Sequence, residues 1–254
     1  MSTVIRLESV SKQFTLRHAK TLKRMTHRAI RGKPLKDSFY AVRDVTFDVQ
    51  AGQSIGLMGH NGSGKSTLLK MVSGVMRPDE GRVGVAGKVA GLIEVGAGFH
   101  PDLTGRENVY LNAAIIGMSE EETDAKFGTI ADFANIGRFL DTEVRHYSSG
   151  MYMRLAFSVA VHADCDIFLV DEGLAVGDAP FKRKCMRKIR EVREQGTTIF
   201  LVSHSAKQVQ KLCDRALVLK EGALVFDGEP VEATRFMNEA SEEIDDGSDE
   251  ETDF

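Results

Sequence analysis

A short glycine-rich stretch, G-H-N-G-S-G-K-S at residues 59–66, constrains the fold of this chain more than any other part of its sequence. It matches the pattern G-x-x-x-x-G-K-[ST], in which glycines let the backbone curl so that successive N–H groups point at phosphate oxygens. Such a loop needs a buried strand before it and a helix N-terminus after it. The apolar run at 54–58 and the helix expected from 64 to about 75 supply both.

The loop predicts a binding site for the phosphates of a nucleotide such as ATP. Lys65 is expected to reach the β- and γ-phosphates, and the Ser66 hydroxyl to bind Mg²⁺. The helix that follows would direct the positive end of its dipole at the same anion. The loop residues expected to contact the nucleotide are Gly59, His60, Asn61, Gly62, Ser63, Gly64, Lys65, Ser66 and Thr67.

Two carboxylates, Asp171 and Glu172, follow the apolar run I-F-L-V at 167–170. A buried strand that ends beside a phosphate loop would place Asp171 near Mg²⁺, with water between them. Glu172 would then orient and deprotonate the attacking water as general base. A strand that simply ends at a polar turn is the alternative, and the presence of the phosphate loop favours the catalytic interpretation.

Strands that alternate with helices along most of the chain predict an α/β fold with a mostly parallel, doubly wound sheet. The stretch 100–150 interrupts this alternation, and we expect helices there from Arg106, Ser119 and Thr129, forming a separate lobe. A basic segment from Leu16 to Ile30 has apolar residues at roughly helical spacing. It predicts a short amphipathic helix or a partly ordered insertion.

The charges are unevenly distributed. Residues 241–254 contain eight carboxylates and no Lys or Arg, which leaves 29 acidic and 33 basic residues in the rest of the chain. Residues 12–36 contain nine Lys or Arg and two His without an acid. We expect the acidic tail to be disordered. Without a leader-like start or an apolar run of 18 residues, we expect neither secretion nor a membrane span.

Four further features resemble those of ABC ATPases. The segment Y-S-S-G-M at 147–151 is similar to the L-S-G-G-Q signature loop of that family and precedes an apolar helix. His204, at the end of an apolar strand, matches the switch histidine that contacts the γ-phosphate, and Asp178 matches the loop that crosses the dimer interface. Tyr40 resembles the aromatic residue that stacks on adenine, with Phe39 and a purely structural tyrosine as alternatives.

The resemblance implies a fold and a set of contacts. The ABC ATPase domain would cover residues 1–240, with a mostly parallel core sheet, a small antiparallel β subdomain and a helical subdomain at about 100–163, before the tail at 241–254. A homodimer would enclose two ATP molecules. In each site one chain would supply Lys65, Ser66, Asp171, Glu172 and His204, and the other Ser148, Ser149 and Gly150.

One departure concerns the metal. The glutamine that the family carries between the phosphate loop and the signature loop is absent, and G-L-I-E-V-G-A-G-F occupies that region. Glu94 is the nearest polar substitute. We therefore treat Glu94 as a candidate third Mg²⁺ contact beside Ser66 and Asp171.

The strings at 91–112, 147–160 and 170–178 resemble more narrowly the ATPase subunits of exporters of O-antigen, teichoic acid or capsule. That resemblance implies ATP hydrolysis that powers the export of a lipid-linked polysaccharide through a separate integral-membrane permease, which would dock near residues 94–112. The chain would then lie at the cytoplasmic face of the membrane, without a nucleic-acid partner. Some members carry a further carbohydrate-binding domain, which we expect to be absent here.

Other functions fit parts of the pattern. The same ATPase could serve a transporter of drugs or lipids, although the strings at 91–112 and 170–178 favour a glycan. A regulatory ATPase that acts on ribosomes or DNA would normally have two fused ATPase halves or long coiled coils, which this sequence lacks. A nucleotide-binding scaffold without turnover is disfavoured by the presence of both Glu172 and His204.

Overall fold

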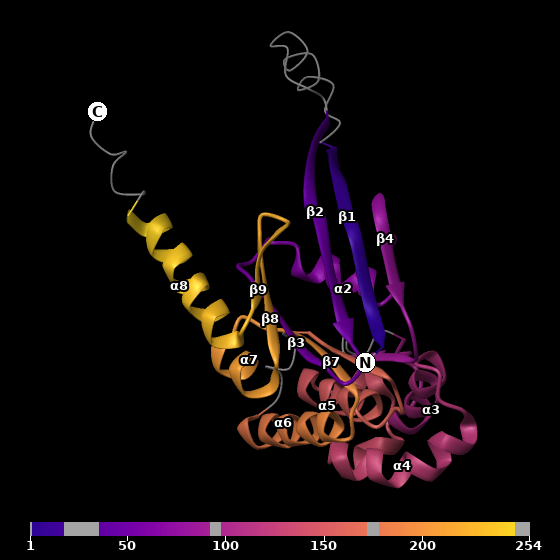
Figure 1. Cartoon of the computed structure of the whole chain (residues 1–254). Coiled ribbons are helices and arrows are strands. Elements are labelled where there is room, and N and C mark those ends of the chain that lie inside the picture. Colours follow the sequence, from indigo (N-terminus) through magenta and orange to yellow (C-terminus); the bar gives the residue numbers. More distant parts are fainter. Residues whose placement is uncertain (1, 18–35, 92–97, 172–177, 247–254) are drawn as a thin grey trace, which may run out of the picture.

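The computed structural model describes residues 2–17, 36–91, 98–171 and 178–246, and its centre is a six-stranded sheet (Figure 1). Neighbouring strands are parallel except for the last two, which form an antiparallel hairpin. The central strands are buried along their whole length, as expected for parallel strands covered on both faces. In spatial order the strands are β5 (Val89–Gly91), β6 (Ile167–Val170), β7 (Thr198–Val202), β3 (Ser54–Met58), β8 (Arg215–Lys220) and β9 (Ala223–Gly228).

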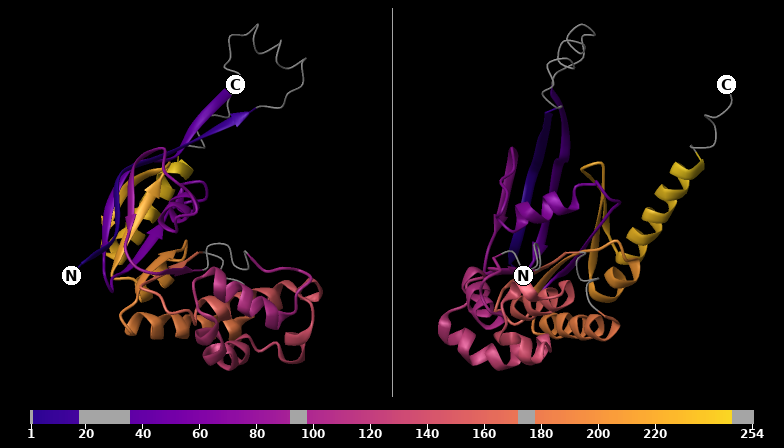
Figure 2. Two further views of the ribbon diagram at one scale, coloured as in Figure 1. Left: turned by 90° about the vertical axis from the view of Figure 1, so that its right-hand side faces the viewer. Right: turned by 180° about the vertical axis from the view of Figure 1, so that it is seen from behind.

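A second, antiparallel sheet has the order β2 (Lys36–Gln50), β1 (Thr3–Arg17), β4 (Glu80–Val85). Past Ser11, where the pairing with β4 ends, β1 and β2 continue as a two-stranded arm (Figures 1 and 2). Leu16 pairs with Asp37, so the helix expected from Leu16 is wrong at its start. Cross-strand hydrogen bonds satisfy the backbone there, which a short isolated helix does poorly. The rest of that expected helix lies outside the described residues.

Two apolar layers cover opposite faces of the central sheet. One face packs against α2 (Lys65–Val72) and the antiparallel sheet, burying Ile5, Leu69 and Phe200 among others. The other face packs against α5 (Ser149–Ala160), α6 (Ala179–Glu194) and α7 (Ala206–Leu212). Together with the antiparallel sheet and the helices, this layering confirms the predicted α/β class.

A third apolar cluster holds the helical lobe, seen at the bottom of Figure 1. Capping boxes start its first two helices, at Thr104 with Glu107 and at Ser119 with Glu122. The second helix begins after its N-cap, Ser119, and ends at Asn135, which has a left-handed φ of 51°. It runs through Thr129 without interruption, so the separate helix predicted from Thr129 is wrong. The lobe consists of α3 (Gly105–Ile115), α4 (Glu120–Ala134), the 3₁₀ turns η1 (Gly137–Asp141) and η2 (Val144–His146), and α5.

The last helix, α8 (Pro230–Asp246), starts beside α7, where Gln210 donates to the Thr234 hydroxyl at 3.0 Å, and then runs away from the helical lobe (Figures 1 and 2). Its backbone stays helical to Asp246, six residues into the segment for which disorder is expected, because extending an existing helix is easier than starting one. Residues 247–254 lie outside the described part. Among the described helices, none has both the length and the apolar character needed to cross a bilayer.

His162, just after α5, makes the stability of this packing sensitive to pH. Its Nδ1 lies 2.7 Å from the Ser158 carbonyl oxygen, and its ring meets Phe133 edge-on at 5.2 Å. Burial, with a smaller effect from nearby lysines, lowers the pKa of the imidazolium. Between the folded and unfolded pKa values the unfolded chain therefore binds more protons. This contribution to stability is complete above about pH 6.5 and is lost as the pH falls below it.

We therefore expect the free energy of unfolding of the wild type to fall more between about pH 7.5 and pH 5.5 than that of His162→Gln, because glutamine keeps a hydrogen-bond donor but does not titrate. Urea unfolding of both proteins at the two pH values measures the difference. If the free energy of unfolding falls by the same amount in both proteins, His162 does not contribute to the pH dependence of stability.

Candidate functional site

The phosphate loop, residues 59–66, connects β3 to α2, and three of its glycines have positive φ. The angle is 147° at Gly59, 83° at Gly62 and 102° at Gly64, values that L side chains rarely adopt. A Cβ at Gly64 would lie 2.1 Å from the Ala41 carbonyl oxygen, and one at Gly59 would lie 2.4 Å from that of Leu219. The loop backbone is therefore in direct contact with β2 and β8.

The N-terminus of α2 is open to an anion. Its N-cap residue is Gly64, which has no side chain to cap the helix, and its first turn contains no acid. Lys65 is 6% exposed, and its Nζ donates to the carbonyl oxygens of Gly59 at 2.8 Å and His60 at 3.1 Å. The ammonium group is thus held inside the loop. The exposed residues around it are His60, Asn61, Gly62 and Ser66, and Thr67 is half-buried.

Three segments leave the central sheet at the same edge. Parallel pairing of β3 with β7 and of β7 with β6 places the carboxyl ends of these strands side by side. The phosphate loop follows β3, half-buried Asp171 follows β6, and exposed His204 lies two residues after β7. Ligands of open α/β sheets bind at such an edge. Glu172 and Glu94 lie outside the described residues, so their roles remain predictions.

The backbone around His204 is fixed by its neighbour Ser203. The Ser203 N–H donates to the Leu57 carbonyl oxygen at 3.2 Å, which ties it to β3. The Ser203 hydroxyl donates to Gln208 Oε1 and accepts from the Ser205 N–H, both at 3.0 Å. His204 is therefore presented from an ordered turn next to the strand that leads into the phosphate loop.

Ser66 and Asp171 are the described residues that could hold a magnesium ion. A hydroxyl and a carboxylate are the hard oxygen ligands that Mg²⁺ prefers, and the ion commonly takes its other ligands from water and phosphates. Both residues lie at the carboxyl edge, Ser66 in the first turn of α2 and Asp171 directly after β6. No group of three metal-ligating side chains converges among the described residues. The hydroxyl of Ser66 and the carboxylate of Asp171 would fit Mg²⁺ that takes its remaining ligands from water and phosphates.

The signature loop, residues 147–151, is anchored by Tyr147, which stands where the family has leucine. The Tyr147 hydroxyl donates to the Phe139 carbonyl oxygen at 2.6 Å. Burial raises the pKa of Tyr147 to about 12, so the phenol stays protonated and keeps this bond. A Cβ at Gly105 would come within 2.0 Å of the same hydroxyl, so α3 also fits closely around it.

Ser148 is the N-cap of α5, and its Oγ accepts from the Met151 N–H at 3.2 Å. Its hydroxyl hydrogen can still be donated to a ligand. Ser148 and Ser149 are exposed, and Gly150 is half-buried. The loop thus presents donors at the protein surface and at the positive end of a helix.

An ion pair connects the signature helix to the start of α6. Arg154 on α5 donates from Nη2 to Asp178 Oδ1 at 2.7 Å, and its guanidinium lies over the Phe181 ring, 5.0 Å from the ring centre. Asp178 is also the N-cap of α6 and accepts from the Phe181 N–H at 3.3 Å. The resemblance points to Asp178, but no motif points to Arg154, whose partner is 24 residues away.

Tyr40 lies on β2, one residue before the carbonyl group that contacts Gly64. It is 37% exposed, and the Arg43 guanidinium lies 5.2 Å from its ring centre. Phe39 instead stacks on Phe14 in the arm, with ring centres 5.9 Å apart. The position of Tyr40 thus fits an adenine contact better than that of Phe39 does.

The turn between β8 and β9 joins the phosphate loop to β2. The Gly222 N–H donates to the Ser63 carbonyl oxygen at 3.1 Å, and the Gly222 carbonyl oxygen accepts from the Arg43 N–H at 2.8 Å. The positive φ values of Glu221, 50°, and Gly222, 81°, make this geometry possible. The sequence predicts the turn, but its contact with the loop has no local signal.

Asn108, in α3, holds the loop from residue 100 to 104 and is fully buried. Its amide nitrogen lies 2.9–3.1 Å from the carbonyl oxygens of His100, Leu103 and Thr104, and its oxygen accepts from the His100 N–H at 2.7 Å. The resemblance predicts a docking surface near residues 94–112, but no motif points to Asn108. An asparagine inside a helix gives no signal that its amide bonds the loop before that helix.

A family profile and several known proteins match this chain, and they agree on one protein family. The ABC transporter family profile matches residues 42–175. An O-antigen export system ATP-binding protein, RfbB of Klebsiella pneumoniae, is 40% identical over 228 residues, which cover 88% of this chain and 93% of that protein. The ABC transporter protein AbcA of Aeromonas salmonicida is 51% identical over 192 residues, or 76% of this chain, and the match spans only 62% of that relative's length.

Among solved structures, a dimeric ATP-binding cassette in a post-hydrolysis state, bound to ADP and Pi, has a TM-score of 0.71 to this chain. The alignment covers 89% of this chain and 98% of the cassette, at 22% identity. At that identity the likeness establishes the fold. It agrees with the predicted combination of a mostly parallel sheet, a small antiparallel sheet and a helical lobe.

The loop geometry predicts unequal effects for two alanine substitutions. Gly64→Ala adds a methyl group against the Ala41 carbonyl oxygen, whereas at Gly62 no atom lies within 4 Å of the added carbon. Both substitutions carry the left-handed backbone penalty of about 1–2 kcal/mol. We expect Gly64→Ala to weaken ATP binding at least about 100-fold and Gly62→Ala at most about tenfold, as measured by calorimetric titration. If both variants fold and lose the same amount of ATP affinity, the contact between residue 64 and the Ala41 carbonyl group does not determine binding.

Proposed function

Since this chain belongs to the ABC transporter family and is an ATP-binding ATPase domain, we propose that two copies of it power the export of a lipid-linked polysaccharide through a membrane permease. The observation that carries the proposal is the shared carboxyl edge of β3, β7 and β6. It gathers the phosphate loop, Asp171 and His204 on one side of the sheet.

Each described residue has a distinct role in the proposed hydrolysis. The N–H groups of the phosphate loop and Lys65 bind the phosphates, and Tyr40 stacks on the adenine. Ser66 and Asp171 hold Mg²⁺, which would neutralise charge that develops between the β- and γ-phosphates. Glu94 is proposed as a further contact to the ion in place of the family's glutamine.

The attacking water is handled by Glu172 and His204 in this proposal. Glu172 accepts the proton of the water as general base, and His204 contacts the γ-phosphate from its ordered turn. Charge on the γ-phosphate also needs donors on the side away from the phosphate loop. The described part of this chain offers such donors in the exposed signature loop, on a different helix.

A second copy would complete each site. Ser148, Ser149 and Gly150 of one chain would face the γ-phosphate bound by the other, and Asp178 would lie at the interface between them. The ion pair from Arg154 to Asp178 links these two interface elements within one chain. The solved cassette with the same fold was found as a dimer, which supports this arrangement.

The export role rests on the relatives and on the loop held by Asn108. RfbB of Klebsiella pneumoniae, named as an O-antigen export ATP-binding protein, aligns over most of both chains. The ordered loop at 100–104 would receive the cytoplasmic helices of a permease, which places this chain at the cytoplasmic face of the membrane. The cargo would be a glycan on a lipid carrier.

Glu172→Gln should bind ATP but trap the closed dimer, because the amide cannot accept the proton of the attacking water. We expect turnover to fall at least about 100-fold, with an ATP-dependent dimer visible by light scattering. Lys65→Ala is the control, since it should lose both nucleotide binding and dimer formation. Unchanged turnover in Glu172→Gln would remove Glu172 as the base.

Purification of the tagged chain from detergent-solubilised membranes of its host should recover an integral-membrane permease. Asn108→Ala should reduce that recovery about tenfold, because the docking loop loses hydrogen bonds together worth about 2–3 kcal/mol. ATP binding by the isolated variant should be unchanged, which separates lost docking from global unfolding. Recovery of ribosomal components alone would contradict the transport role.

A further inference from the structure

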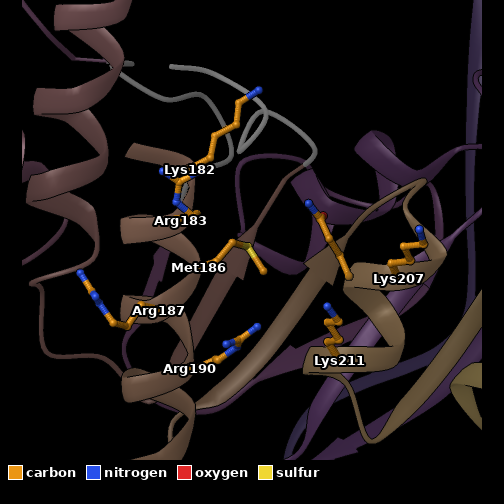
Figure 3. Close-up of a pocket in the computed structure, with 8 residues that line it drawn as sticks. Lys182, Arg183, Met186, Arg187, Arg190, Lys207 and Lys211 are labelled. Atoms are coloured by element: carbon orange, nitrogen blue, oxygen red, sulfur yellow. The ribbon is translucent and has the colours of Figure 1, made fainter. Parts of the chain in front are cut away.

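Helices α6 and α7 enclose a groove of about 480 Å³ whose lining is strongly basic (Figure 3). We call it the α6–α7 groove. Met186 and Arg190 project from α6 toward α7, which carries Lys211 on the facing side (Figure 3). Among the residues that the structure describes, no carboxylate lines the groove. Its six cationic residues are Lys182, Arg183, Arg187, Arg190, Lys207 and Lys211.

The cations of the groove differ from the other basic residues of α6. Lys188 pairs with Glu191, Arg193 pairs with Asp214, and Lys184 donates to backbone carbonyl groups. None of the six groove cations makes an ion pair with a carboxylate that the structure describes. Like charges on facing helices repel one another, and an anionic partner would relieve that repulsion.

The arrangement of charge and the lining of the groove indicate which kind of anion could bind there. Arg183, Arg187 and Arg190 follow one another along α6, so the charge is spread over about two turns and not focused on one point. The described lining contains no aromatic side chain to stack on a base, and Met186 offers apolar contact. An acidic peptide with few apolar side chains matches this lining.

The chain contains such a peptide. Residues 241–254, S-E-E-I-D-D-G-S-D-E-E-T-D-F, carry eight carboxylates, no base and two large apolar residues, Ile244 and Phe254. We propose that the α6–α7 groove binds the acidic segment 241–254 of a second copy of this chain.

The segment of the second copy fits better than that of the same chain. α8 starts beside α7 but carries its C-terminal end away from the groove over 17 residues, or about 25 Å (Figures 1 and 2). The eight residues after Asp246 span at most about 28 Å, so in the same chain only the last few could return. The groove also begins one turn after Asp178, the N-cap of α6, which we propose to lie at the dimer interface. The inference therefore rests on the proposed dimer.

Zero-length carbodiimide cross-linking of a mixture of ¹⁴N- and ¹⁵N-labelled full-length chains, with and without ATP, tests the proposal. We expect mass spectrometry to find mixed-isotope peptides that join residues 241–254 to Lys207 or Lys211. About 0.5 M NaCl should reduce their yield several-fold, because salt screens exposed charges. Same-isotope links alone would mean that the segment binds its own chain, and no links would mean another anion. Either result overturns the proposal.

Two matched variants check that the groove itself is responsible. Lys182→Gln/Arg190→Gln removes two groove cations and leaves Lys207 and Lys211 for coupling, so the mixed-isotope yield should fall about five- to tenfold. Lys88→Gln/Arg77→Gln removes one lysine and one arginine that are exposed elsewhere and should change nothing. Equal yields from both variants would refute the groove as the binding site.

Light scattering separates this inference from the proposed function. If Glu172→Gln forms no dimer with ATP, the proposed function fails. If the dimer forms and mixed-isotope links are absent, only the groove assignment fails.

Discussion

The parallel ladder that joins β6, β7, β3 and β8 is the constraint on which the rest of the structure depends. Its register brings segments separated by more than one hundred residues to a single edge. Because these strands are buried on both faces, the ladder cannot slip without moving apolar side chains into the wrong layer. The positions of Asp171 and His204 relative to the phosphate loop are therefore fixed by the core.

Around this ladder, contacts between backbone groups hold the phosphate loop in place. Gly64 lies against the Ala41 carbonyl group on one side, and the Gly222 turn bonds to Ser63 on another. These neighbours come from β2 and from the β8–β9 turn, which belong to different sheets. The loop is thus the meeting point of the two sheets, and its glycines are required by that crowding as much as by the ligand.

Much of this arrangement could be predicted from sequence because it depends on local patterns. The phosphate loop requires a strand before it and a helix after it, and Ser119 with Glu122 marks a helix start. Two predicted helix starts are wrong. Leu16 lies in a strand because it pairs with the strand across the hairpin, and Thr129 lies inside a continuous helix. The partners of Arg154 and Gly222 are far away in the sequence and give no local signal.

In the candidate site, too, local motifs identify some residues, whereas others are explained only by contacts that the structure shows. The motif alone identifies Ser148 and its neighbours, yet Tyr147, which departs from the family pattern, is explained only by its hydrogen bond to Phe139. Likewise, the sequence of α6 is rich in Lys and Arg, but the groove forms only because α7 packs opposite α6.

The buried amide of Asn108 has a consequence for association. Its two N–H donors are shared among three carbonyl oxygens and its oxygen accepts from one N–H group, so it restricts the backbone of the neighbouring loop when the chain folds. A partner that meets this loop does not have to order it, so little conformational entropy is lost there on binding. Encounter with such a rigid surface should proceed at ordinary diffusional rates, and differences in affinity among partners should arise mainly from how fast they dissociate.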